Sequence, residues 1–165
     1  MTPTPSKTKV VLAQVTMLLV IALIIGGALS HDFSAAVRQR IWQNVLERPG
    51  GPMAFRFIIQ PVMATIAAFR DGVRDGRTGR SPYLWTILTN RSDRGGRLRE
   101  GLVSTAQIIL IGLVIDTIYQ LTVLEAFYPG EAAIVALLLA FLPYLLLRGP
   151  IARITRWWHS DRTIH

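Results

Sequence analysis

The feature that most constrains this chain is the twenty-residue run VVLAQVTMLLVIALIIGGAL at positions 10 to 29. Only Gln14 and Thr16 place polar side chains in it. As an α-helix the run is ~30 Å long, which matches the hydrocarbon thickness of a bilayer. The alternative is a cleavable signal peptide ending near Ala28-Leu29-Ser30, but the apolar regions of signal peptides are usually only ~7–15 residues long. The sequence therefore favours a retained transmembrane anchor at 10–29.

Two further apolar runs predict a transmembrane hairpin over residues 101–148. The first crossing is 101–124, the turn is EAFYPG, and the second crossing is 131–148. The uncharged core of the second crossing makes only ~24 Å of helix, so Glu131 and Arg148 are expected near the two interfaces. No cysteine is present in the chain, so the composition excludes disulfides and thiolate metal sites. We predict an all-α membrane protein with one membrane domain, 1–165.

Residues 31–100 are amphipathic and basic, and we expect them to be largely interfacial or cytoplasmic. Residues 31 to 48 have the spacing of a surface helix, and RPGGP ends it. Residues 53 to 75 also have helical spacing, with polar and apolar side chains on opposite sides. The polar side holds Arg56, Gln60, Arg70, Asp71 and Arg74, and the apolar side holds Phe55, Ile58, Ile59, Val62, Ile66, Phe69 and Val73.

Amphipathic helices more often lie in the membrane interface than cross it. The sequence therefore favours an interfacial or re-entrant helix here, and a short crossing at 55–70 is the alternative. The chain has three transmembrane helices in the first case and four in the second. The loop segments DGRTGRSP and NRSDRGG have turn compositions, and a short helix is expected between them.

The distribution of basic residues predicts the orientation of the hairpin. The chain carries 18 Lys and Arg against 10 Asp and Glu. Twelve of the basic residues lie at 70–100 and from Arg148 to the end, and these segments flank the same hairpin. Because cytoplasmic loops are enriched in Lys and Arg, both segments, including the basic tail at 149–165, are expected in the cytoplasm. EAFYPG is then on the other side of the membrane.

The side of the N-terminus depends on the number of crossings. Three crossings place it outside with 31–100 in the cytoplasm, and four crossings place it inside with 31–52 outside. The charge rule slightly favours three crossings, because only Lys7 and Lys9 are then outside. A short N-terminal segment with two lysines usually stays inside, which favours four.

The arginines near the interface predict contacts with anionic lipid headgroups, each worth ~1 kcal/mol. Nucleic acid is not an expected partner, because no groove-reading helix or aromatic-interleaved basic motif is present. The arginines expected to contact lipid are Arg70, Arg74, Arg77, Arg80, Arg148, Arg153 and Arg156.

One carboxylate, Asp116, interrupts the crossing at 101–124. It lies ~24 Å past the edge at Glu100, nearer the outer face than the midplane. An acid at the centre of a membrane helix costs ~2.5–3.5 kcal/mol on insertion scales, so Asp116 is expected to face protein or a wet crevice. Tyr119 and Gln120 share its helical face. The favoured interpretation is a structural cluster of hydrogen-bonded polar groups, joined by Arg56 if 53–75 reaches it, and the alternative is a proton or cation relay.

No motif for catalysis, metal binding or cofactor binding is present. The three histidines show no ligand spacing, and there is no glycine-rich phosphate loop or nucleophile elbow. We therefore expect no catalytic residue, no metal and no cofactor, and we do not expect an enzyme.

Four stretches carry a resemblance to known sequences: the run from FRFIIQPVMATIAAF to SPYLWTIL, then DTIYQ, YPGEA and PYLLLRGPIARI. Over residues ~53–156 the chain resembles an uncharacterised family of small integral inner-membrane proteins of Gram-negative bacteria. The resemblance implies a multi-pass protein of the bacterial inner membrane and no particular activity.

Two functions fit these expectations. The first is a non-catalytic accessory or scaffold subunit of a larger membrane complex, or a homo-oligomer, whose partners are other membrane subunits or copies of itself. The second is a small oligomeric channel or a proton- or cation-coupled transporter that uses Asp116.

Overall fold

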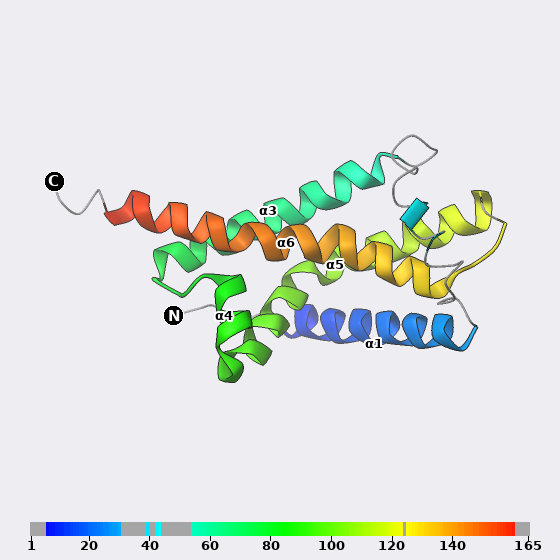
Figure 1. Ribbon diagram of the computed structural model, residues 1–165, viewed down its shortest axis with the longest axis horizontal. Helices are drawn as coiled ribbons and strands as arrows, with labels where there is room; N and C mark the ends of the chain where they lie inside the picture. The colour runs from blue at the N-terminus through cyan, green and yellow to red at the C-terminus, as the bar shows by residue number, and fades with distance from the viewer. Residues whose placement is uncertain (1–5, 31–38, 40–41, 44–53, 124, 161–165) are drawn as a thin grey trace.

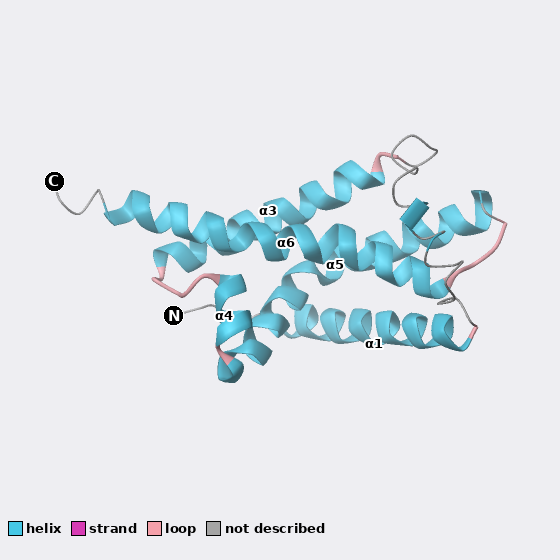
Figure 2. Ribbon diagram, viewed as in Figure 1, coloured by secondary structure: helices cyan, strands magenta, loops and turns pink. Residues whose placement is uncertain are grey.

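The computed structural model describes residues 6–30, 39, 42–43, 54–123 and 125–160. Five helices are defined within these residues, and no strand occurs among them (Figures 1 and 2). This confirms the all-α class. The amphipathic helix expected over residues 31 to 48 lies outside the described residues, except for three positions, as does the RPGGP break.

Three helices are long and apolar enough to cross a membrane. They are α1 (Lys7–Leu29), α5 (Arg91–Val123) and α6 (Pro129–Ser160). Each contains the apolar run from which a crossing was predicted. The chain is therefore a multi-pass membrane protein by length and composition, as the sequence indicated.

Two of these helices extend beyond their predicted ends. NRSDRGG was expected to be a turn, but α5 begins at Arg91 and includes both of its glycines. Asn90 supports this start, because its Oδ1 accepts a hydrogen bond from the backbone N–H of Ser92 at 3.1 Å. The helix α6 likewise continues past Arg148 through Pro150, so the expected basic tail begins as helix.

The remaining helices are α3 (Arg56–Arg77) and the short α4 (Tyr83–Thr89). The segment α3 is one continuous helix through Pro61. It runs beside α6 in the same direction, whereas α1 and α5 run the opposite way (Figure 1). The carboxyl end of α1 lies beside the start of α6, since a Cβ on Gly26 would lie 4.0 Å from Pro129. The N-terminal end of α1 therefore lies at the end of the bundle where α3 and α6 finish.

The two sides of α3 have the composition that its periodicity predicted. Their surroundings differ from those of an interfacial helix, because the polar side faces the protein. Its polar side chains Arg56, Gln60 and Asp75 are buried against the protein. An interfacial helix would turn that side to water. The outward side is apolar and exposes Phe55, Ile58, Ile59, Val62, Met63, Ile66 and Phe69.

Small residues every four positions bring α3 and α6 into close contact. On α3 these residues are Ala64, Ala68, Gly72 and Gly76, all of them buried. A Cβ on Gly76 would lie 2.7 Å from Thr155 on α6. Helices in membranes associate by such small-residue faces, which let the backbones approach closely.

Replacing Gly72 by alanine is therefore expected to loosen this contact. The new Cβ would lie 2.9 Å from the Arg148 carbonyl oxygen and from Ile151, so the helices must separate at a cost of roughly 1–3 kcal/mol. Unfolding of the detergent-solubilised protein would measure this loss. Gly95→Ala is the matched control, because nothing lies within 4 Å of its Cβ. It should be neutral or slightly stabilising, and equal destabilisation by both variants would contradict the close contact.

Candidate functional site: two buried polar clusters

Two clusters of buried polar side chains lie at opposite ends of the interface between α3, α5 and α6. The Asp116 cluster comprises Arg56 and Gln60 of α3 and Asp116 and Gln120 of α5, all of them at most 5% exposed. The second, the Asp75 network, lies where α3 ends and comprises Asp71, Arg74, Asp75, Arg80, Tyr83, Arg97, Glu100, Ser104, Tyr144 and Arg148.

An ion pair between Arg56 and Asp116 forms the centre of the Asp116 cluster. Nη1 of Arg56 donates to Oδ1 of Asp116, and Nε2 of Gln120 donates to the other carboxylate oxygen at 2.8 Å. Arg56 Nε also donates to Gln60 Oε1 at 3.2 Å. The structure thus brings together Asp116, Gln120 and Arg56, and it places Tyr119 half-buried on the same helix.

The two amides of this cluster connect it to α6. Nε2 of Gln60 donates to the Ala136 carbonyl at 3.1 Å, and Oε1 of Gln120 accepts from the Tyr128 backbone N–H at 2.6 Å. A Cβ on Gly112 would overlap the Gln60 side chain, so glycine is needed for this approach. The cluster therefore holds α3, α5 and the start of α6 together.

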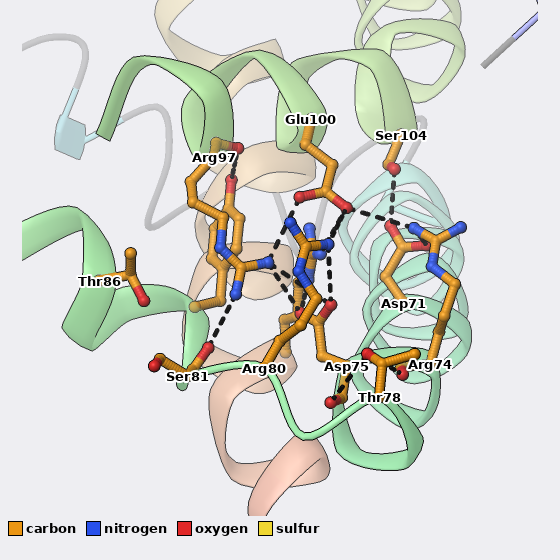
Figure 3. Close-up of polar contacts among 12 residues, drawn as sticks. Asp71, Arg74, Asp75, Thr78, Arg80, Ser81, Thr86, Arg97, Glu100 and Ser104 are labelled. Carbon is orange, nitrogen blue, oxygen red and sulfur yellow. Dashed lines mark hydrogen bonds and ion pairs between the residues drawn. The ribbon is translucent and has the colours of Figure 1, made fainter. Parts of the chain in front are cut away.

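Asp75 is the centre of the second network (Figure 3). Its carboxylate is fully buried and receives hydrogen bonds from three arginines. Arg148 Nε donates to it at 2.8 Å and Arg97 Nη1 at 3.3 Å, while Arg80 Nη1 donates at 3.4 Å. Glu100 pairs with the same three arginines, at 3.0 Å in the case of Arg148. Two carboxylates are therefore shared among three guanidinium groups.

Asp71 extends this network toward the Asp116 cluster, one helical turn back along α3. Its Oδ2 accepts hydrogen bonds from the Ser104 hydroxyl at 2.6 Å and from the Tyr144 hydroxyl at 2.7 Å, while Arg74 pairs with its other oxygen at 3.1 Å. Arg148 in turn donates to the Tyr144 hydroxyl at 2.6 Å. Three carboxylates thus face four guanidiniums, which leaves the network with one formal positive charge.

Tyr83 attaches α4 to this network. Its ring is fully buried, its hydroxyl donates to the Arg97 carbonyl at 2.8 Å, and the Arg148 guanidinium lies 4.3 Å from the ring centroid. A Cβ on Gly101 would overlap the Tyr83 hydroxyl. Burial raises the pKa of Tyr83 to about 12, although the nearby Arg148 acts in the opposite direction.

This pKa predicts a loss of stability in strong base. Because folded Tyr83 holds its proton more tightly than an unfolded tyrosine with a pKa near ~10, its contribution is complete below about pH 10. It is lost as the pH rises from there through about 12, amounting to roughly 2–3 kcal/mol. The measurement is the free energy of unfolding at about pH 9 and pH 11.5. Tyr83→Phe should show a smaller decrease over this interval than the native chain, and an equal decrease would contradict the assignment.

The arginines expected to contact lipid fall into three groups. Arg70, Arg77 and Arg153 are exposed and remain suited to headgroup contacts. Arg74 and Arg80 are about one-third exposed and pair with acids, while exposed Arg156 donates to the Arg80 carbonyl. Arg148 is fully buried, so its predicted contact with lipid is wrong. The cause is the carboxylate of Asp75, which pairs with Arg148 inside the protein.

The section between the two clusters is apolar. The buried side chains there belong to the facing sides of the three helices and include Ala64, Ala68, Ile109, Leu113 and Ala140. The buried Thr105, beside the Asp75 network, donates its hydroxyl to a carbonyl of its own helix. The described residues therefore form no continuous row of polar groups from one cluster to the other. No three acidic or histidine side chains within the described part of the chain are close enough to bind a metal ion.

Sequence reasoning did not find the Asp75 network, because the charged residues at 70 to 100 were interpreted as a basic interfacial or cytoplasmic segment with turns at DGRTGRSP and NRSDRGG. A signal was present in the spacing of small residues. Four small residues recur at four-residue intervals, namely Ala64, Ala68, Gly72 and Gly76. Such a row marks a helix contact face, and this one continues to the Arg-Asp-Gly at 74–76. Asp75 lies beside that row.

Comparison with known proteins gave no matching family, no matching curated protein and no matching solved structure.

Proposed function

We propose that this protein is a non-catalytic subunit of a membrane assembly, acting as an accessory or scaffold component beside other subunits or copies of itself. The inner membrane of a Gram-negative bacterium is the proposed location. The observation that carries the proposal is the mutual pairing of the buried charges. Asp116 and Asp75 each bind side chains of this chain, and such pairing fixes helix positions rather than presenting a reactive group.

A relay function for Asp116 is less well supported by this geometry. A proton carrier must release and rebind its proton, and both oxygens of Asp116 are bound, one to the cation Arg56. Protonation of Asp116 would leave the buried Arg56 guanidinium without its negative partner, which is unfavourable. The apolar section between the clusters also separates Asp116 from the acids at the other end.

The proposed topology has four crossings, with both termini in the cytoplasm. Its fourth crossing is α3, which is less apolar than the other three helices because its polar side faces the protein. Arg56 and Asp75, near the two ends of α3, are 19 positions apart. This is ~28 Å of helix, close to the ~30 Å hydrocarbon thickness. The apolar outward side of α3 suits lipid, and four crossings place Lys7 and Lys9 on the same side as the arginine-rich segments.

Single cysteines would test this topology, since the chain has none of its own. Variants Thr8→Cys, Thr78→Cys and Glu125→Cys place thiols at exposed positions near three helix ends. A membrane-impermeant maleimide added to intact spheroplasts should label only the Glu125 variant, and lysis should expose the other two. Labelling of the Thr8 variant from outside would overturn the four-crossing arrangement.

Purification under mild detergent would test the assembly role. Affinity-tagged protein from native membranes should elute in a complex of fixed stoichiometry, identified by mass spectrometry and native gel. A strictly monomeric protein would overturn the proposal. So would proton or cation flux in liposomes that Asp116→Asn abolishes while the variant remains folded, because that result would support the transporter alternative.

A further inference from the structure

The outward face of α5 is an apolar seam with one polar position. Its exposed side chains recur at alternating spacings of four and three residues, which is the pattern of a helix seam that packs against another helix. Ile111, Val114, Ile118 and Leu121 are between 41% and 56% exposed. The seam consists of Gln107, Ile111, Val114, Ile118 and Leu121.

Gln107 is the unusual member of this seam. Its side chain is exposed, and no hydrogen bond joins its amide to any other described residue. It lies seven positions after Glu100, which is ~10 Å along the helix into the membrane. Hydrocarbon offers no hydrogen-bond partner, and an unpaired amide in such surroundings is costly.

We propose that this α5 seam is the contact between two copies of the chain. The inference deepens the assembly role proposed above and rests on it. Two copies inserted with the same topology are related by a twofold axis normal to the membrane, so Gln107 of one copy faces Gln107 of the other. An amide is self-complementary, because its N–H₂ donates and its oxygen accepts. A symmetric pair can therefore satisfy both side chains where lipid satisfies neither.

The other outward faces have less need of a protein partner. The outward side of α3 has no polar residue between Phe55 and Phe69, so lipid alone can cover it. On α1, Gln14 is also exposed, but it follows Lys9 by five positions. It is therefore only ~8 Å from the charged end, where the headgroup region begins. Gln107 lies deeper and requires a partner more strongly.

Disulfide cross-linking in native membranes would locate the contact. A single cysteine at Val114, in the seam, should give a covalent dimer of twice the chain mass on mild oxidation. A single cysteine at Ile58, on the outward side of α3, should give little. Equal cross-linking at both positions, or none at Val114, would overturn the proposed contact.

The amide itself is tested by Gln107→Leu. Because Gln107 is exposed, this change should leave the fold intact, as circular dichroism and thermal unfolding would verify. The dimer dissociation constant in lipid bilayers, measured by energy transfer between labelled copies, should rise roughly 3- to 30-fold. Gln14→Leu is the matched control and should leave it unchanged. An unchanged constant for Gln107→Leu would overturn the role of the amide.

Failure of this inference can be separated from failure of the assembly role. If the Val114 cysteine cross-links to a different protein, the assembly role stands and self-pairing is wrong. If the chain is monomeric by every measurement, both proposals are wrong.

Discussion

Asp75→Asn is expected to lower the free energy of unfolding by about 3–5 kcal/mol, which is the usual cost of removing one partner from a buried ion pair. The native carboxylate is fully buried and receives hydrogen bonds from Arg80, Arg97 and Arg148. An amide of the same shape keeps the volume but leaves these three guanidiniums with less negative charge. The resulting repulsion lies within the contact between α3, α5 and α6. Denaturant unfolding in mixed micelles would measure the loss.

Asp93→Asn provides the matched control for this change. Asp93 is exposed at the amino end of α5, where it accepts a hydrogen bond from Asn90 at 2.8 Å. The same substitution there should change stability by less than about 0.5 kcal/mol. Similar effects of the two variants would show that the buried network contributes little.

Asp116→Asn is expected to have the second large effect, again about 3–5 kcal/mol of lost stability. The neutral amide can still accept from Gln120, but Arg56 then remains buried with its positive charge uncompensated. The sequence placed Arg56 beside Asp116 only if residues 53–75 reached it, and the structure pairs the two side chains.

The double variant Arg56→Met/Asp116→Leu separates a structural pair from a functional acid. Replacing both charges by apolar side chains should recover most of the stability lost by Asp116→Asn, since buried pairs are often neutral relative to well-packed apolar replacements. If Asp116 is structural, the double variant should also keep its partners in a purification. A stable double variant that loses ion flux shown by the native chain would contradict the structural role.

The apolar helices could be predicted from the sequence because their signal is local. The twenty-residue run in α1, with only two polar side chains, has few alternatives to a membrane crossing. The helix ends were less predictable. Gly95 and Gly96 indicated a turn, yet both are helical, because α5 begins at Arg91, where Asn90 accepts a hydrogen bond from the Ser92 N–H.

The polar contacts could be predicted only in part, since they depend on which helices become neighbours. Because Asp116 lies within an apolar run, the sequence predicted a partner for it inside the protein. Arg56 was expected in its cluster only if residues 53–75 reached it. Asp75 gave no comparable signal, because an acid between arginines also fits a solvated loop. Its burial depends on the glycines and alanines that bring α3 against α6, and that pairing is not local in the sequence.

The inward polar side of α3 also has a consequence for how the chain is made. Gln60 and Asp75 hydrogen-bond to α6 residues 76 and 73 positions later. At translation rates of ~5–20 residues per second, α3 leaves the ribosome roughly 4–15 s before those partners are synthesised. The α5 partners follow sooner, because Arg97 comes 22 positions after Asp75 and Asp116 comes 60 positions after Arg56. In the proposed topology the polar side of α3 is therefore covered in two steps, first by α5 and then by α6.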